Sequence, residues 1–377
     1  MINMVEKSKC CGCSACAQSC PKHCINMSED EEGFQYPQVN SNLCINCGLC
    51  EESCPIFEKK VPQIPIETVG AVNLKRSVVE KSSSGGIFSA LSEHVINKGG
   101  VVFGASYNEK WDVCHSWVSD ISSLNRFRGS KYVQSSIGKS YREVRDFLMK
   151  DREVLFSGTP CQVAGLKSFL KKDYEKLLTV EVACHGVPSP KVYRDYLKYV
   201  SKDRIESITE ISFRNKRKGW LHYRFIINAM IKGKKKIILN EKRSDNYYMQ
   251  SFLKNYNLRP SCYECSFKAG CSNADLTLAD FWGVWDIAPD FFHKTGVSII
   301  LINSIKGKAN VEQLDIEKII VDYSNVVKYN SCLIHSSIKP SNRSLFWQYW
   351  QNNNRGKLHH LLRKTSLLNR IIRFFLK

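Results

Sequence analysis

The stretches CCGCSACAQSCP (residues 10–21) and CINCGLCEESCP (residues 44–55) decide how the N-terminal part of this chain folds. Each contains the spacing C-x2-C-x2-C-x3-C-P, and the second repeats the first without deviation. Three cysteines at this spacing wrap one iron–sulfur cubane, and the fourth, before the proline, reaches the neighbouring cubane. We therefore predict two [4Fe-4S] clusters with crossed ligands, which are Cys10, Cys13, Cys16 and Cys54 for the first and Cys44, Cys47, Cys50 and Cys20 for the second.

The alternative for these cysteines is a pair of zinc knuckles. Zinc takes four ligands in two separated pairs, and triplets that end in Cys-Pro do not suit that arrangement. Cys11 and Cys24 lie outside the repeated spacing, so we expect them to be bystanders. Paired clusters of this kind move single electrons, so another site should exchange electrons with them.

The composition sets the class of protein. The chain has 377 residues, 43% of them hydrophobic, a net charge of +19 and 17 cysteines, so we expect two to three folded domains. The opening residues contain no apolar signal-peptide region, and no run of about 18 apolar residues occurs. We therefore expect a cytoplasmic protein that does not span a membrane. Cysteines in a reducing cytoplasm are better explained by metal binding than by disulfides.

The chain divides by composition. Residues 1–60 are polar and cysteine-rich, residues 61–67 (VPQIPIE) read as an extended linker, and ordinary globular composition follows. We divide the body into residues 68–150 and 151–335, followed by a basic amphipathic tail at 336–377. The predicted fold class is α+β: a two-cluster ferredoxin domain fused to a mixed, α/β-like body.

Hydrophobic periodicity predicts the elements of the body. Helices are expected over 87–97, 140–150 and 162–172, and strands at 101–107, 153–158, 176–184, 276–283 and 297–304. Residues 220–242 should form a hairpin that turns at KGKK (232–235).

Further cysteines stand in distinctive surroundings in the body. Cys161 follows a predicted strand, with Pro160 suited to the first position of a helix whose N-terminus favours a thiolate. Cys184 ends the next strand, and Cys262 and Cys265 form a CYEC pair. One alternative is a nucleophilic Cys161 with His185 as its base, and another is a zinc site that includes the CYEC pair and Cys271.

Several motifs of the body resemble one known family, the coenzyme F420 hydrogenase/dehydrogenase beta subunits, here with a ferredoxin extension in front. The resemblance covers about residues 1–305 and occurs in the expected order. It rests on SSSGGIFSAL (82–91), RGSKYVQS (128–135), GTPCQVAGL (158–166), CHGVPSP (184–190), and CYEC (262–265) followed by DLTLADFWG (275–283).

This resemblance implies FAD and a third [4Fe-4S] cluster beside it. The implied cluster ligands are Cys161, Cys184, Cys262 and Cys265, and Cys271 is either a departure from the pattern or a substitute ligand. The implied flavin contacts are Ser84, Gly85, Gly86, Lys131, Tyr132, Gly158 and Thr159. A glycine turn before a helix suits a pyrophosphate, although an ordinary serine cap with glycines is the alternative.

The sequence therefore predicts an FAD- and iron–sulfur-dependent oxidoreductase. Its electrons would pass between the clusters and FAD, and FAD would reduce or oxidise a small molecule, such as a precursor in surface polysaccharide biosynthesis. The alternative is an electron-transfer subunit of a hydrogenase or dehydrogenase complex with no substrate of its own. No side chain is singled out as catalytic. The expected partner is an electron donor or acceptor protein, or the small-molecule substrate.

Two basic segments also stand out. Between Arg214 and Arg243 lie 11 basic residues and a single acidic one, which indicates either an anion site or a solvated hairpin whose lysines discourage edge pairing. No nucleic-acid-binding fold accompanies this charge, so nucleic acid is not expected as a partner. The tail ends in HHLLRKTSLLNRIIRFFLK (359–377), a basic helix with one apolar side. The alternatives for it are peripheral contact with a membrane and docking onto the body.

Overall fold

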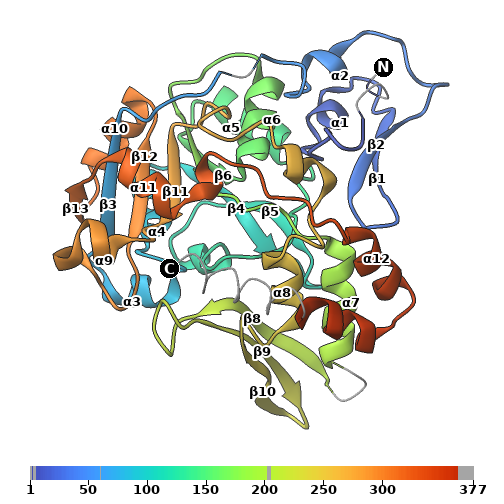
Figure 1. The fold of residues 1–377 in the computed structure, drawn as a ribbon. Helices are drawn as coiled ribbons and strands as arrows, with labels where there is room; N and C mark the ends of the chain where they lie inside the picture. The colour runs from blue at the N-terminus through green and yellow to red at the C-terminus, as the bar shows by residue number, and fades with distance from the viewer. Residues whose placement is uncertain (1, 3–5, 60, 202–204, 364–377) are drawn as a thin grey trace.

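The computed structural model describes residues 2, 6–59, 61–201 and 205–363. The N-terminal part, blue in Figure 1, lies beside helices α5 (Ser140–Met149) and α6 (Pro160–Leu170) of the body. It contains two short helices and one antiparallel hairpin whose strands pair Ile25 with Val39. These elements are α1 (Ala15–Ser19), β1 (Ile25–Glu29), β2 (Gln35–Val39) and α2 (Leu49–Glu52).

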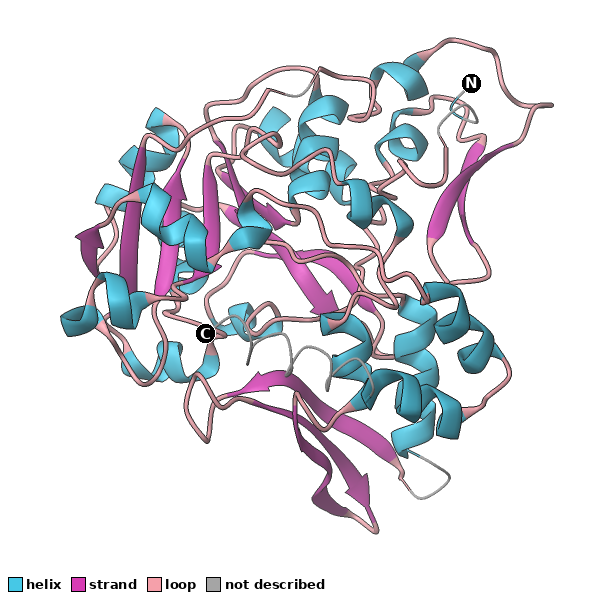
Figure 2. Ribbon diagram, in the orientation of Figure 1, coloured by secondary structure: helices cyan, strands magenta, loops and turns pink. Residues whose placement is uncertain are grey.

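A mixed eight-stranded sheet forms the centre of the described body (Figure 2). Strands β4, β6, β7 and β11 run parallel to one another, and the outer strands are antiparallel to their neighbours. This mixed sheet confirms the predicted fold class. In spatial order the strands are β13 (Ile316–Ile320), β3 (Glu67–Asn73), β12 (Ser298–Ile302), β11 (Leu276–Asp280), β7 (Leu177–Val182), β6 (Val154–Gly158), β4 (Val101–Tyr107) and β5 (Val113–Val118).

Helices cover both faces of this sheet, because side chains alternate between the faces along each strand. Val101 and Phe103 pack with α5 (Ser140–Met149) and α6 (Pro160–Leu170). Val102, between them, packs with α4 (Ile87–Asn97) on the other face. The three predicted helices and five predicted strands of the body are confirmed.

A second, three-stranded antiparallel sheet lies at the bottom of Figure 1. The predicted hairpin is confirmed as β9 (Arg224–Ile231) and β10 (Lys234–Lys242), and β8 (Ser207–Asn215) adds a strand that the sequence did not predict. Aromatic side chains fill the core between this sheet and three helices. These helices are α7 (Pro190–Ser201), α8 (Tyr247–Leu253) and α12 (Arg343–Gln351).

Strands from both predicted body segments share the large sheet, so no break in the sheet falls at residue 150. The predicted linker is extended and is hydrogen-bonded to the body: Gln63 N donates to Ala269 O, and Ile66 N donates to Ile302 O. The remaining elements are α3 (Arg76–Lys81), η2 (Ser122–Arg126), η4 (Pro260–Glu264), α9 (Val284–Ile287), η5 (Pro289–Phe291), α10 (Ile305–Glu312), α11 (Tyr323–Tyr329) and η6 (Ser331–Leu333).

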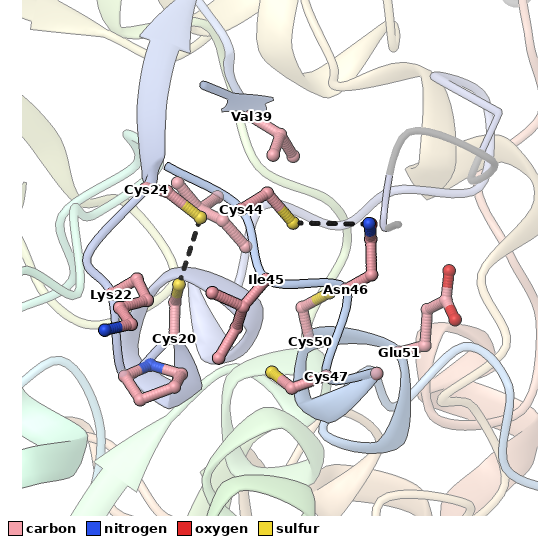
Figure 3. Close-up of a pocket in the computed structure, with 13 residues that line it drawn as sticks. Cys20, Lys22, Cys24, Val39, Cys44, Ile45, Asn46, Cys47, Cys50 and Glu51 are labelled. Carbon is pink, nitrogen blue, oxygen red and sulfur yellow. Dashed lines mark hydrogen bonds between the residues drawn. The ribbon is translucent and has the colours of Figure 1, made fainter. Parts of the chain in front are cut away.

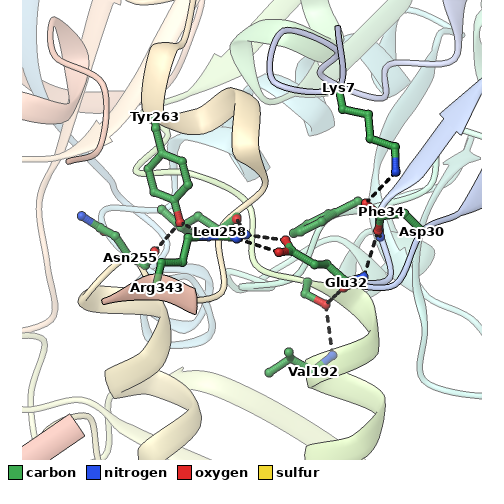
Figure 4. A network of polar contacts seen from close by, with 10 residues as sticks. Lys7, Asp30, Glu32, Phe34, Val192, Asn255, Leu258, Tyr263 and Arg343 are labelled. Carbon is green, nitrogen blue, oxygen red and sulfur yellow. Dashed lines mark hydrogen bonds and ion pairs between the residues drawn. The ribbon is translucent and has the colours of Figure 1, made fainter. Parts of the chain in front are cut away.

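Ion pairs join the acidic N-terminal part to the basic body. Arg343 holds both carboxylate oxygens of Glu32, with Nη1 2.6 Å from Oε1, and also donates to Leu258 O (Figure 4). Similar pairs, 2.6 and 2.5 Å long, join Arg194 to Glu29 and Lys171 to Glu52. Residues 1–60 contain 8 acidic and 5 basic side chains, so the difference in charge helps to attach this part to the basic body.

The tail packs on the body as far as it is described. Residues 355–363 are helical. Leu358, Leu361 and Leu362 are buried in the core between the three-stranded sheet and helices α7, α8 and α12. The rest of the predicted amphipathic helix, 364–377, lies outside the described residues. Within the described chain, no helix combines the length and the apolar character that a membrane crossing requires.

Glu181 of β7 makes stability depend on pH. Burial raises the pKa of this carboxyl to about 7, although hydroxyl donors Ser272 and Thr277 oppose that shift. A raised carboxyl pKa means that the folded state binds the proton more tightly. The protonated Glu181 carboxyl therefore contributes to the free energy of unfolding. This contribution is fully present below the ordinary carboxyl pKa of about 4.5 and is lost as pH rises through about 7.

We expect Glu181→Gln to raise the melting temperature relative to the unsubstituted chain, and more at pH 8 than at pH 6. The gain at pH 8 corresponds to no more than about 3.5 kcal/mol, because burial raises the pKa from 4.5 to about 7 and one pKa unit is worth about 1.4 kcal/mol. Thermal unfolding of the cluster-loaded protein at both pH values measures this. An equal gain in melting temperature at pH 6 and pH 8 would contradict the raised pKa of Glu181.

Candidate iron–sulfur centres

One pocket contains the second predicted cysteine set (Figure 3). Its lining includes Cys44, Cys47 and Cys50 from the second motif and Cys20 from the first. The structure thus brings Cys20 to the triplet with which crossed ligation pairs it. Cys24, predicted to be a bystander, also lines this pocket, with its sulfur 3.3 Å from that of Cys20.

The first predicted set lies together beside helix α6. Burial raises the pKa of the Cys16 thiol to about 12, and the nearby thiols of Cys10 and Cys54 act in the same direction. Cys54 comes from the second motif, so the crossing occurs here too. Gly165 in α6 makes this approach possible, because a Cβ atom at that position would lie 2.9 Å from Cys13 Sγ.

The four body cysteines assigned by resemblance line one further pocket. Cys161 follows β6 and Cys184 follows β7, and these neighbouring strands are parallel, so their carboxyl ends meet at one edge of the sheet. Cys262 and Cys265 reach the same pocket from η4 and its end. Cys271 is not among the residues that line it.

The chemistry of this third set fits an iron–sulfur cluster. Burial raises the pKa of the Cys184 thiol and raises that of Cys262 to about 12. Four half-buried thiolates around one pocket therefore require positive charge, which iron supplies. Among the described side chains, no three His, Cys, Asp or Glu converge closely enough to hold a single metal ion.

Cys11 is the unexpected neighbour in this pocket. It is 7% exposed, lines the pocket of the third set, and lies close enough to Cys13 and Cys161 for their side chains to act on the pKa of its thiol. It therefore lies between the first and third cysteine sets. Sequence spacing could not identify this position, because it depends on how the N-terminal part docks onto the body.

The geometry does not favour the nucleophile alternative for Cys161. Its sulfur contacts Cys11 and lies 3.2 Å from Thr159 Oγ1. His185 lines the same pocket, but its ring is engaged with Asn255, with Nε2 2.6 Å from Oδ1. Burial lowers the pKa of His185, so the neutral ring serves this hydrogen bond.

The predicted flavin contacts fall into two groups. The 82–86 turn and the 129–132 loop meet where Ser83 Oγ and Ser130 Oγ lie 2.8 Å apart. Gly158 and Thr159 lie at the start of α6, where Thr159 N donates to Gln162 Oε1 at 3.0 Å.

The glycine turn has internal partners. Ser84 Oγ donates to Val297 O, and Gly85 N donates to Ser298 Oγ at 2.9 Å. A Cβ atom at Gly85 would lie 2.5 Å from Ala71 O. Packing of the turn against β3 and β12 is therefore enough to require glycine there.

Residues outside the predicted flavin contacts surround this turn. Arg214 is buried against Asp280, with Nη1 2.5 Å from Oδ2, but its Nε and Nη2 have no hydrogen-bond partner. Trp220 and Trp282 stack in parallel at 4.8 Å nearby, and Trp220 donates to the same aspartate. Burial lowers the pKa of Lys216, which donates to Ser84 O, to about 7.

The RGSKYVQS loop connects the two regions. Ser130 N donates to Ser83, and Tyr132 packs on Phe252. Further along, Gln134 Nε2 donates to Cys11 O at 3.1 Å. Burial lowers the pKa of Lys131, between them, to about 7. The loop thus extends from the glycine turn to the cysteine pockets.

Comparisons with known proteins agree with the motifs. Residues 9–57 match the family model of the 4Fe-4S dicluster domain. Residues 151–325 match the family model for the C terminus of the coenzyme F420 hydrogenase/dehydrogenase beta subunit. The predicted resemblance and the 4Fe-4S character of the N-terminal part are confirmed.

Among the solved structures that are similar to this chain is a chain of the F420-reducing [NiFe] hydrogenase complex from Methanosarcina barkeri. It has 14% sequence identity and a TM-score of 0.48, with coverage of 73% of this chain and 93% of that chain. No curated protein matches the chain.

We expect Gly165→Ala to displace Cys13 and remove about four irons. Helix propensity alone would make this substitution favourable by about 1 kcal/mol, so a loss must come from the contact with Cys13. The measurement is iron and sulfide content after anaerobic purification. Gly356→Ala, at a helical position with open space around it, is the control and should keep its full iron content. Full iron in both variants would contradict the contact.

Proposed function

We propose that this chain, a member of the coenzyme F420 hydrogenase/dehydrogenase beta-subunit family with a 4Fe-4S dicluster domain in front, is an iron–sulfur electron-transfer subunit. The proposal places electrons on three [4Fe-4S] clusters, held by the two crossed cysteine sets and by Cys161, Cys184, Cys262 and Cys265. Such clusters accept and release one electron at a time. In this division residues 1–60 carry two clusters and the body at 68–335 holds the third.

The order of the cysteine sets is the observation that carries this proposal. Cys50, of the second set, acts electrostatically on Cys16 of the first. Cys11 contacts Cys13 of the first set and Cys161 of the third. The three sets therefore form one row, and electrons passing along it need not leave the protein interior between the first and third sets.

The outer end of this row suits a partner protein. Cys47 of the second set is exposed, and its neighbours Leu43 and Ile45 are 55% and 57% exposed. The loop 38–50 carries no charged side chain. Lys22 and Glu51 also line this pocket, and the rest of its rim is uncharged and partly apolar. This rim is the surface at which we propose that an electron donor or acceptor docks, as a beta subunit would within a hydrogenase- or dehydrogenase-like complex.

FAD is the second element of the proposal, and the surroundings of Arg214 favour it. Two guanidinium nitrogens without partners, a parallel tryptophan pair and two lysines of lowered pKa lie around the 82–86 turn and the 129–132 loop. Buried cationic and aromatic groups of this kind match a phosphate-bearing aromatic ligand. A bound flavin would convert single electrons into two-electron chemistry on a small molecule.

We expect the chain to bind about twelve irons, and Cys184→Ser to bind about eight, because a cubane needs all four thiolates. Cys271→Ser is the matched control, since Cys271 lies outside the pocket of the third set. Iron and sulfide analysis with electron paramagnetic resonance of the reduced protein measures both. About eight irons in the unsubstituted chain would remove the third cluster from the proposal.

We expect Lys131→Met to lower FAD content without loss of iron, because an anionic ligand would restore the charge that burial disfavours at Lys131. Lys139→Met, at an exposed position beside α5, is the control. Flavin released by acid is measured against iron in the same sample. A fully iron-loaded chain without any flavin would leave only the electron-transfer role.

A further inference from the structure

We propose that Arg259 is a positioning residue that serves as the shared counter-charge of the first and third clusters and raises the reduction potentials of both. This inference rests on the proposed function for the third cluster but not for the first. Arg259 immediately precedes Pro260, where η4 begins, and η4 carries Cys262. Its side chain is fully buried, at 0% exposure.

The guanidinium binds the first cysteine loop. Nε donates to Cys10 O at 2.7 Å, Nη2 donates to Gln35 O at 2.9 Å, and Nη2 lies 3.8 Å from Cys10 Sγ. The guanidinium carbon of Arg259 also lies over the ring of Tyr36, at 4.3 Å from the ring centroid. These contacts fix the position of the positive charge beside a ligand of the first cluster.

The same side chain lines the pocket of the third cysteine set. Nη1 donates to Gln134 Oε1 at 3.1 Å, and that glutamine in turn donates to the carbonyl of Cys11. The backbone of Arg259 accepts from Cys262 N at 2.9 Å. Arg259 therefore lies between the two sets and touches a residue of each.

The charge of Arg259 has no compensation from a carboxylate. Its hydrogen-bond partners are backbone carbonyls, one amide oxygen and a thiol, and it forms no ion pair with Asp or Glu within the described ranges. A buried charge without a partner is costly, so such groups are normally paired. A [4Fe-4S] cluster with four thiolates carries about −2 in its oxidised form, and two such anions flank this side chain.

The sequence makes room for this arrangement at Gly12. A Cβ atom there would lie 2.8 Å from Arg259 Nη1, and the backbone at Gly12 has a positive φ of 69°. Because reduction adds negative charge to a cluster, a nearby fixed positive charge favours the reduced state. The effect should reach the first and third sets and not the second, whose pocket does not include Arg259.

The test is a redox titration of the full chain, followed by electron paramagnetic resonance, with Cys184→Ser used to assign the third cluster. Arg259→Gln should make reduction of the first and third clusters at least tenfold less favourable, which is about 59 mV for a one-electron couple. The potential of the second cluster should not change. Iron content, measured in parallel, reports on the third cluster itself.

Arg343→Gln is the matched control, because Arg343 attaches the same N-terminal part to the body through Glu32 without contacting a cysteine. It should leave all potentials unchanged. Unchanged potentials in iron-loaded Arg259→Gln, or an equal shift in Arg343→Gln, would overturn the inference.

Arg259→Lys covers the case in which Arg259→Gln fails to assemble its clusters. Lysine keeps the charge but not the planar fork. Full iron with potentials close to those of the unsubstituted chain would support the inference, and loss of clusters in both variants would overturn it by assigning Arg259 to folding alone. If the unsubstituted chain binds only eight irons, the third-cluster proposal fails while the shift at the first cluster still tests Arg259.

Discussion

The cysteine loop at residues 10–13 is packed between helix α6 and the buried guanidinium of Arg259, and the arrangement of the cysteine sets depends on this contact. Gly165 admits Cys13 on one side, and Gly12 admits Arg259 on the other. If either space were filled, the loop would have to withdraw from the body. The first set would then separate from the pocket where β6 and β7 end, because Cys11 makes the contact between them.

Electrostatics and packing act together at this junction. The pairs of Glu32 with Arg343 and of Glu29 with Arg194 lie around the contact, and each joins an acidic N-terminal residue to a basic residue of the body. The Glu29–Arg194 pair is partly exposed, and such pairs contribute little on their own. The Glu32–Arg343 pair is largely buried, where the cost of desolvation offsets much of the attraction. Both pairs are therefore better understood as setting orientation than as supplying most of the stability. The packing of the buried thiols and of Arg259 fixes where the N-terminal part lies on the body, and the ion pairs adjust its orientation.

The sequence predicted those elements whose periodicity is strong. The helices at 87–97 and 140–150 and the strands at 101–107 and 153–158 have apolar side chains that fit a single period, and the structure has them with small shifts at the ends. Strand β13 was not predicted because it is a largely exposed edge strand, so its residues show no buried face. The eight cysteines of the two motifs were identified by spacing alone, since spacing along the chain determines how a short loop can surround a cluster.

Features that depend on tertiary contact could not be predicted in the same way. Cys11 was expected to be a bystander, yet docking places its sulfur between two cysteine sets. Arg259 had no distinctive local sequence, and only the approach of Cys10 and Gln35 from the N-terminal part gives it partners. The glycine turn at 84–86 was interpreted through a ligand, whereas its tight contacts to β3 and β12 already account for Gly85. A short motif identifies a ligand securely when several of its side chains must converge on that ligand, as the cysteines do. A glycine turn is weaker evidence, because packing against neighbouring strands can require glycine without any ligand. The function of this chain is therefore inferred mainly from the cysteine sets.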